Sequence, residues 1–383
     1  MTENAALAGV RPRRGVGATL PDFPWDSLSG AKTRAAAHPD GIVDLSVGTP
    51  VDPIADVVRR GLDDGAEFPG YPATAGTAEL RDAAAAALTR RYGSTPLDGS
   101  SILPVIGTKE AIASIVSLLG FGPGDEIVIP EVAYPTYEVG VLLAGATPVR
   151  ADSTLALGPS RPGAIFLNSP SNPTGRVLGV EHLRKVVAWA RERGTIVISD
   201  ECYLGLAWDA EAVSILDPRV CDGDVSGLIA VHSLSKISNL AGYRAGFLAG
   251  DRDLIGELLA VRKHAGLIVP FPVQSAMTAA LGDDEHVADQ RERYRARRIA
   301  LATAVRHAGF RIDHSEAGLY LWATRGEACR DTVAWLAELG ILAAPGEFYG
   351  PAGAQHVRIA LTATDERIAA AVARLTETVA VDS

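Results

Sequence analysis

Short apolar runs alternate with longer amphipathic segments along most of the chain. The runs are rich in β-branched residues and apolar throughout, a pattern typical of strands that helices cover on both faces. The predicted strands are residues 102–106, 126–129, 164–167, 195–199, 228–233 and 246–250, and the clearest predicted helices are residues 108–119, 180–193 and 252–265. Strands that alternate with helices in this way predict an α/β fold, with a mostly parallel sheet sandwiched between helices.

The pattern changes from about residue 275. A long charged helical segment, residues 286–309, precedes two short strand-like runs at 318–324 and 356–362, with a predicted helix around Thr332–Leu339 between them. Short strands mixed with helices in this order predict a smaller α+β unit.

Composition narrows the class of protein. Of the 383 residues, 47% are hydrophobic and 21% are charged, as in an ordinary soluble globular protein. The formal net charge of −10 argues against general affinity for nucleic acid or an anionic membrane, so an anionic ligand must rely on a few well-placed cations. The three cysteines are far apart and form no CxxC pair, which favours a reducing compartment.

Targeting signals are not evident in the pattern. The arginines near the N-terminus precede a segment that Gly, Pro and Asp interrupt, so it cannot serve as the apolar region of a secretory leader. The longest apolar stretch, around residues 112–121, is too short to span a bilayer. We therefore expect a cytoplasmic protein.

The densest chemical signal is the segment HSLSKISNLAGYRAGFLAGD, residues 232–251. Lys236 comes just after a predicted strand, Ser233 and Ser235 flank it, and Arg244 follows in a turn bounded by glycines. Lysine is the side chain that forms Schiff bases, and hydroxyls with an arginine suit a phosphate. Taken alone, a segment of this kind is more often a solvated surface loop.

Two further segments place polar residues after predicted strands. Asp200 follows the strand at 195–199, with Tyr203 three residues on, and Asn172 lies in the turn NSPSNPTGRV. Open α/β sheets keep their ligand contacts at the carboxyl ends of strands. The alternative readings are a helix-capping Asp and a plain turn.

The remaining two segments are weaker signals. In VIGTKEAIASI, Gly107 and Thr108 open a helix whose N-terminal N–H groups can bind an anion, although Thr is also a common N-cap. In IPEVAYPTYE, Tyr134 can lie flat against a ring bound in front of the sheet, or can be a core tyrosine.

In their order and spacing, these five segments resemble the aspartate aminotransferase superfamily of pyridoxal 5'-phosphate (PLP) enzymes. The resemblance runs from about residue 22 to the C-terminal helix, and LPDFPWDSL, DLSVGTPVDP and APGEFYG are similar to segments of the succinyldiaminopimelate aminotransferases. It implies PLP-dependent transferase fold type I, with a mostly parallel seven-stranded sheet and a small α+β domain. The domains implied are a flexible arm at 1–20, a large PLP-binding domain at 46–275, and a small domain made of 21–45 and 276–383.

The resemblance also implies roles around the cofactor ring. Lys236 would hold the PLP aldehyde covalently and, once freed, carry the proton between substrate and cofactor. Asp200 would keep the pyridinium nitrogen protonated, which makes the ring an electron sink. Asn172 and Tyr203 would hydrogen-bond the ring oxygen, and Tyr134 would stack on the ring.

The same resemblance assigns the phosphate and substrate contacts. The phosphate would be held by Gly107, Thr108, Lys109, Ser233 and Arg244, with Ser235 as a further candidate. Tyr71 would reach the phosphate of a neighbouring subunit, which implies a homodimer with shared active sites. Arg358 would bind the substrate α-carboxylate with help from Gly48 and Asn172, because its planar fork matches a carboxylate. The alternating pattern of its strand could equally place Arg358 on a solvated face.

The expected reaction is therefore transamination of N-succinyl-LL-2,6-diaminopimelate with 2-oxoglutarate, a step of lysine and diaminopimelate biosynthesis. The alternatives are an aminotransferase of common amino acids and a PLP-dependent carbon–sulfur lyase. A PLP-sensing regulator is disfavoured, because no helix-turn-helix module or basic patch is evident. Arg262 and Lys263 are candidates for the distal substrate carboxylates only by elimination, and can equally be exposed helix residues. We predict no metal site, and interpret the acids beside His286 as helix capping.

Overall fold

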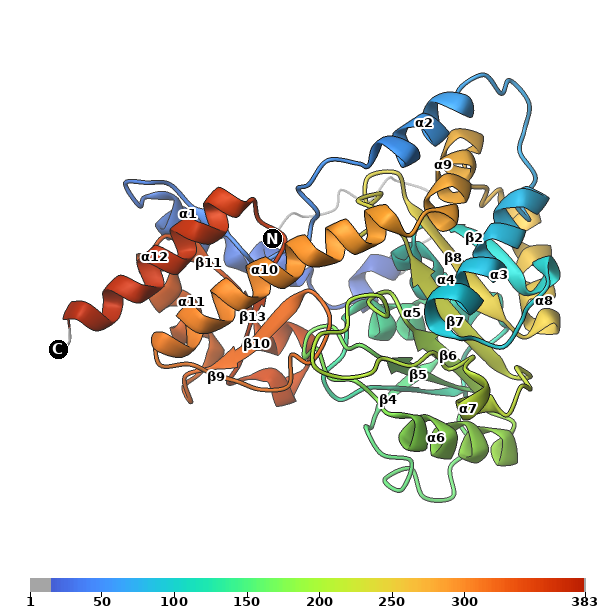
Figure 1. The fold of residues 1–383 in the computed structure, drawn as a ribbon. Coiled ribbons are helices and arrows are strands. Elements are labelled where there is room, and N and C mark those ends of the chain that lie inside the picture. The colour runs from blue at the N-terminus through green and yellow to red at the C-terminus, as the bar shows by residue number, and fades with distance from the viewer. Residues whose placement is uncertain (1–14, 382–383) are drawn as a thin grey trace, which may run out of the picture.

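The computed structural model describes residues 15–381, and its larger sheet has seven strands (Figure 1). The strands are β2 (Ile102–Ile106), β3 (Glu126–Ile129), β4 (Thr147–Arg150), β5 (Ala164–Asn168), β6 (Ile196–Asp200), β7 (Leu228–Ser233) and β8 (Ala245–Gly250). Their order across the sheet is β2-β8-β7-β6-β5-β3-β4, and only β8 runs antiparallel to its neighbours. This confirms the predicted sheet and adds β4, an edge strand. It was not predicted because its sequence, TPVR, has a polar residue at each end and so forms no apolar run.

Helices cover both faces of this large sheet. In β5, Ile165 and Leu167 belong to one apolar core, whereas Ala164 and Phe166 belong to another on the opposite face. The first core is completed by α2 (Asp56–Asp64), α3 (Ala78–Tyr92), α6 (Val180–Arg193), α7 (Pro218–Cys221) and α9 (Phe271–Gly282), and the second by α4 (Thr108–Leu118), α5 (Thr136–Ala144) and α8 (Arg252–Ala265). Strands buried on both sides explain why the apolar runs are continuous.

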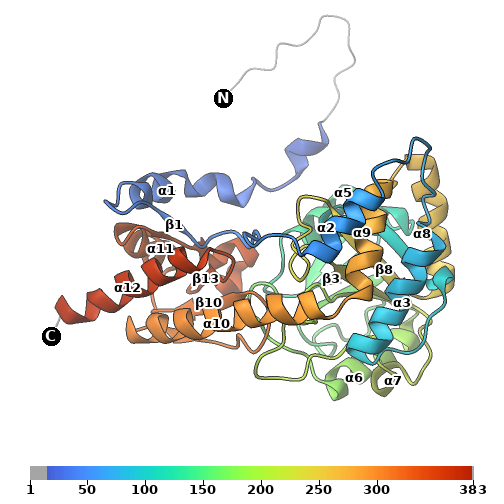
Figure 2. The ribbon, with the colours of Figure 1, turned by 45° about the horizontal axis from the view of Figure 1, so that its top comes forward.

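The second unit is built around a four-stranded antiparallel sheet of order β12-β13-β10-β9. Its strands are β9 (Arg311–Ile312), β10 (Tyr320–Thr324), β12 (Ala344–Pro345) and β13 (Val357–Ala360), and its helices are α1 (Ser29–Ala36), α11 (Cys329–Glu338) and α12 (Asp365–Val381). A parallel pair joins β1 (Val43–Asp44) to β11 (Ile341–Leu342), so the N-terminal stretch returns to the C-terminal segment. Helix α10 (Glu285–His307) runs from this small sheet to the large one (Figure 2).

The predicted domain boundaries stay predictions. Residue 275 falls within α9, which packs against α2 and α3 on the large sheet. Most of the predicted arm, residues 1–14, lies outside the described residues, and residues 16–19 form a short 3-10 helix. Within the described part of the chain, no helix is both long enough and apolar enough to cross a membrane.

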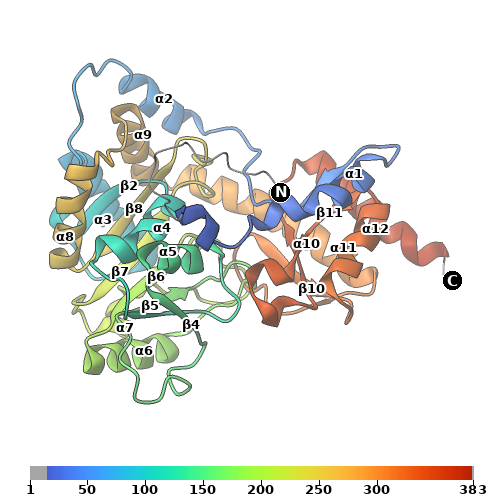
Figure 3. The same ribbon diagram turned by 180° about the vertical axis from the view of Figure 1, so that it is seen from behind.

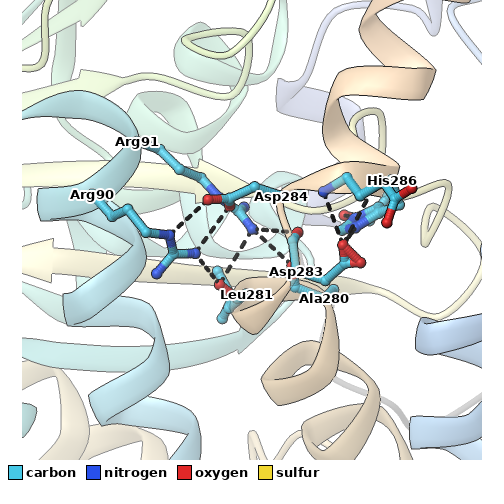
Figure 4. A network of polar contacts seen from close by, with 9 residues as sticks. Arg90, Arg91, Ala280, Leu281, Asp283, Asp284 and His286 are labelled. Atoms are coloured by element: carbon cyan, nitrogen blue, oxygen red, sulfur yellow. Dashed lines mark hydrogen bonds and ion pairs between the residues drawn. The ribbon is translucent and has the colours of Figure 1, made fainter.

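A polar network fastens α3 to the junction between α9 and α10 (Figure 4). Arg91 donates to Asp284 at 2.6 Å and to the backbone oxygens of Ala280 and Asp283 at 2.8 and 2.9 Å. Arg90 donates to the two oxygens of Asp284 at 2.7 and 3.0 Å. The Asp283 carboxylate accepts the first N–H groups of α10, so the acids of this segment cap a helix and bind arginines. The network fixes the direction in which α10 leaves the large sheet.

Candidate active site

The sheet topology brings the predicted site residues to one edge. Strand β5 ends at Asn168 beside Asp200, the last residue of β6, and β7 ends at Ser233. Strand β2 ends just before Gly107, whereas antiparallel β8 begins just after Arg244, so its first residue lies at the same edge. Segments up to about 140 residues apart in sequence therefore meet where parallel strands end.

An anion-binding cradle forms between α4 and β8. Gly107 has a φ of +88°, and a Cβ there would lie 2.2 Å from Nη2 of Arg244, so the guanidinium packs directly on glycine backbone. Thr108 opens α4 and Lys109 follows it, while the Ser233 hydroxyl accepts the N–H of Ser235 at 3.1 Å. Burial, helped by the charge of Arg244, lowers the pKa of Lys109. Two cations and several donors at a helix N-terminus suit a phosphate.

Asp200 is a buried carboxylate, 5% exposed, with a donor on each oxygen. The Tyr137 hydroxyl donates to Oδ2 at 2.7 Å, and the N–H of Cys202 donates to Oδ1 at 3.1 Å. Burial raises the pKa of Asp200, while these hydrogen bonds favour its ionised form and oppose the shift. Tyr137 is completely buried, stacks on Phe166 and meets Tyr134 edge-on at 5.8 Å. Tyr137 is not among the site residues predicted from the sequence, although it lies three residues after Tyr134.

Lys236 lies between the two units of the structure. Its Nζ donates to the backbone oxygen of Gly48, and burial lowers the pKa of Lys236, as do the charges of Arg358 and Arg244. The neutral form of the amine is therefore populated at a lower pH than it would be in water. The backbone of Gly48 lies against Tyr320, because a Cβ there would be 2.2 Å from the Tyr320 hydroxyl oxygen. The hydroxyl of Tyr320 in turn shares a hydrogen bond of 3.1 Å with that of Tyr203. This pairing of Tyr203 with Tyr320 was not predicted from the sequence.

Arg358 on β13 is 3% exposed, so the alternative of a solvated face is wrong. Its Nη1 donates to Oδ1 of Asn172 at 2.9 Å, and its Nη2 donates to the Ser46 carbonyl at 2.7 Å. Its guanidinium carbon lies 4.0 Å from the ring centroid of Tyr320. The backbone N–H of Asn172 donates to Asn168 at 2.7 Å, which ties the turn to the end of β5. Arg358 and Asn172, which come from different units, are thus in contact.

Some predicted contacts are not brought together. Tyr71 is 99% exposed in the single chain. Arg262 is 1% exposed and forms an ion pair with Glu110 at 2.9 Å, so it is neither an exposed helix residue nor free to bind a distal carboxylate. Lys263 next to it is exposed.

The assembled groups fit the cofactor that the sequence resemblance implies. PLP combines an aldehyde, a pyridine nitrogen and a phosphate. The site offers a buried amine at Lys236, a buried carboxylate at Asp200 and a cationic cradle. In the cradle, the guanidinium of Arg244 can lie against the backbone only because position 107 is glycine. An arginine held in a buried position nearby suits a carboxylate substrate.

Comparisons with known proteins agree with this geometry. Residues 40–375 match the family Aminotransferase class I and II. The probable aminotransferase Rv1178 of Mycobacterium tuberculosis is 66% identical over 370 residues, which cover 97% of this chain and 88% of that protein. The 4-dedimethylamino-4-oxo-anhydrotetracycline transaminase OxyQ of Streptomyces rimosus is 60% identical over 357 residues, which cover 93% of this chain and 99% of that protein. Among solved structures, N-succinyldiaminopimelate aminotransferase from M. tuberculosis has a TM-score of 0.83 at 27% identity, covering 96% of this chain and all of that chain.

Proposed function

The chain belongs to the class I and II aminotransferases, and from this we propose that it transfers the amino group of N-succinyl-LL-2,6-diaminopimelate to 2-oxoglutarate. The products are N-succinyl-2-amino-6-oxopimelate and glutamate, in lysine and diaminopimelate biosynthesis. PLP is the cofactor of this family, whose members exchange amino groups between amino and keto acids. Support for the substrate comes from the structural likeness to the N-succinyldiaminopimelate aminotransferase and from the sequence segments that resemble that group.

The observation that carries the proposal is a buried amine placed between a buried carboxylate and a buried arginine. When bound, PLP supplies an electron sink for the negative charge that develops on the substrate carbon. Asp200 would pair with the pyridine nitrogen and favour its protonated form, and Lys236, whose pKa burial lowers, would hold the cofactor aldehyde and accept the proton of the substrate carbon at its Nζ. Arg358 binds the substrate carboxylate.

The other side chains hold the reactants in place. Tyr203 and Asn172 would hydrogen-bond the ring oxygen, and Tyr134 would pack on the ring face. The phosphate would be bound by the cradle residues Gly107, Thr108, Lys109, Ser233, Ser235 and Arg244. Asn172 would also donate to the substrate carboxylate, with the backbone at Gly48 beside it.

We further propose a homodimer in which Tyr71 completes the partner's phosphate site. The 99% exposure of Tyr71 in the single chain supports a role outside its own subunit. The cytoplasmic location stays a prediction from composition.

A second candidate function rests on the 60% identity with OxyQ, a transaminase of 4-dedimethylamino-4-oxo-anhydrotetracycline, which is a polycyclic ketone. The rings of Phe23, Trp25 and Phe348 form an aromatic row with centroid separations of 5.6 and 5.4 Å, and Trp25 lies 6.0 Å from the guanidinium carbon of Arg358. Aromatic side chains beside the site suit a ring-containing substrate. The alternatives of a common amino-acid donor and a carbon–sulfur lyase stay open.

A donor panel distinguishes these functions. With 2-oxoglutarate as the acceptor, the holoenzyme is assayed with one amino donor at a time: N-succinyl-LL-2,6-diaminopimelate, free LL-2,6-diaminopimelate, alanine, aspartate or an aromatic amino acid. A separate assay uses glutamate as the donor and a polycyclic ketone as the acceptor. We expect the highest kcat/KM for the succinylated donor; a common donor or the ketone that exceeds it by orders of magnitude would overturn the substrate assignment. With a cysteine thioether as the substrate, release of pyruvate, ammonia and a thiol would indicate a carbon–sulfur lyase.

The role of Lys236 has its own test. Borohydride reduction of the holoenzyme should attach the pyridoxyl group to Lys236, and Lys236→Ala should lose both the label and turnover. A label on another lysine would refute the site assignment whatever the substrate.

A further inference from the structure

Three buried polar atoms around Arg358 have no hydrogen-bond partner among the described residues. They are the indole Nε1 of Trp25, the hydroxyl of Tyr349 and Nε of Arg358 itself. The guanidinium carbon of Arg358 lies 6.0 Å from the ring centroid of Trp25 and 5.1 Å from that of Tyr349. The three unpaired groups therefore share one small region of the site.

Such a cluster is unusual in a folded protein. Roughly 90% or more of buried polar groups find a partner, because leaving one unpaired forfeits its hydration without compensation. Of the five N–H bonds of a guanidinium, Arg358 uses one for Asn172 and one for Ser46, so three remain. An indole N–H can only donate, and a phenol hydroxyl can donate. The shared missing partner is consequently an acceptor, and the cationic Arg358 selects an anionic one.

Trp25 belongs to a segment that crosses the site, residues 22–28, which we call the N-terminal strap. Figure 3 shows the chain, in dark blue, passing from beside α4 and α5 toward α1. At one end of the strap, Nζ of Lys109 lies 5.5 Å from the ring of Phe23. At the other, Leu28 is buried in the core of the small sheet.

The strap is also tied to the turn that carries Tyr349. Arg330 donates to the Ser27 hydroxyl at 3.0 Å and forms an ion pair with Glu347 at 2.6 Å. The ring of Trp25 packs at 5.4 Å from that of Phe348. These contacts hold the indole in place through its apolar surface and leave its N–H free.

We propose that Trp25 and Tyr349 are substrate-binding residues, each donating a hydrogen bond to the carboxylate that Arg358 binds. A carboxylate has about four acceptor sites on its two oxygens, so it can accept from the indole N–H and the phenol O–H as well as from Arg358 and Asn172. The strap thereby becomes part of substrate recognition, and the site favours amino and keto acids over amines that lack this carboxylate. This inference rests on the proposed role of Arg358.

The test measures binding of 2-oxoglutarate to the PLP form of the holoenzyme by calorimetry, together with kcat/KM for L-glutamate. Trp25→Phe keeps an aromatic ring and deletes the N–H, and Tyr349→Phe deletes only the hydroxyl. Each should weaken 2-oxoglutarate binding and lower kcat/KM roughly tenfold to a hundredfold, the range for one hydrogen bond to a charged group. The melting temperature should change little, because these groups make no hydrogen bond in the free protein. Trp335→Phe, whose ring packs on Phe310 outside the site, serves as the matched control and should leave both readouts unchanged.

The outcomes separate this inference from the proposed function. If Arg358→Leu abolishes 2-oxoglutarate binding but Trp25→Phe and Tyr349→Phe bind as the unmodified enzyme does, the inference is wrong and the role of Arg358 stands. If Arg358→Leu binds normally, the proposed carboxylate site itself is wrong. A large fall in melting temperature for Trp25→Phe without a change in binding would assign the strap a structural role and overturn the inference.

Discussion

Replacing Tyr137 with phenylalanine tests how the protein keeps a buried carboxylate ionised. The hydroxyl of Tyr137 is one of two donors to Asp200, at 2.7 Å, and the substitution removes it without changing the ring that stacks on Phe166. The backbone donor from Cys202 at 3.1 Å remains. We expect Asp200 to become easier to protonate, and so less able to hold a proton on the pyridine nitrogen.

The size of the effect follows from the charge on the acceptor. A hydrogen bond to an ionised group contributes about 1.5–3 kcal/mol, and losing this one from Tyr137 raises the pKa of Asp200 further, in the direction in which burial already shifts it. If the chemical step carries the whole loss, kcat falls about tenfold to a hundredfold. KM should change by less than about threefold, because Tyr137 is not part of the carboxylate site proposed around Arg358.

The assay combines single-turnover kinetics of the cofactor absorbance with a double-mutant cycle. Asp200→Asn removes the charge that Tyr137 supports, so adding Tyr137→Phe to it should cost much less than in the unmodified enzyme. Tyr92→Phe, which removes another phenol hydroxyl from a ring that stacks on His232, is the matched control. An unchanged kcat in Tyr137→Phe, or equal costs in both backgrounds, would refute the reasoning.

Three further predictions concern the scaffold. Burial raises the pKa of Glu201 to about 7 from 4.5, so between these pH values the native state holds a proton that the unfolded chain releases. The free energy of unfolding should therefore fall by roughly 3 kcal/mol as pH rises from about 4.5 to 7. Urea titrations of Glu201→Gln should lose this pH dependence, and a variant that keeps it would count against the prediction. Asp284→Ala should lower the free energy of unfolding by only about 1 kcal/mol, because this carboxylate is half exposed, and the loss should shrink in 1 M salt; a salt-independent loss would contradict an ionic origin. Gly107→Ala should weaken PLP binding at least about tenfold, because the new Cβ would lie 2.2 Å from the guanidinium of Arg244 and displace it. The helical circular dichroism should stay unchanged. An unchanged PLP affinity would show that the phosphate cradle does not depend on glycine at position 107.

Much of the scaffold was predictable, because continuous apolar runs and glycine-bounded turns are local features. The helices predicted at 108–119, 180–193 and 252–265 are present with nearly those bounds. Strand β4 was not predicted because its residues are only partly buried at the sheet edge, where apolar side chains are not required. The predicted strand-end positions of Asp200 and Lys236 followed from the same local pattern.

The partners of those residues were not predictable in the same way. A period-two pattern shows which side chains of β13 share a face, but it does not show which face is buried, so Arg358 stayed ambiguous until its contacts with Asn172 and Ser46 were seen. Arg262 looked like a free surface cation because Glu110, its partner, lies about 150 residues earlier in the chain.

The sequence by itself determined the order of strands and helices, the kind of chemistry and the residues placed at strand ends, because each depends on neighbours along the chain. The tertiary structure decided which of those residues share a site and which additional ones join them. Tyr137 became the support of Asp200, and Trp25 and Tyr349 came to surround Arg358, only through packing between distant segments. Burial and unpaired donors are properties of that packing, and they carry the functional proposals made for this protein.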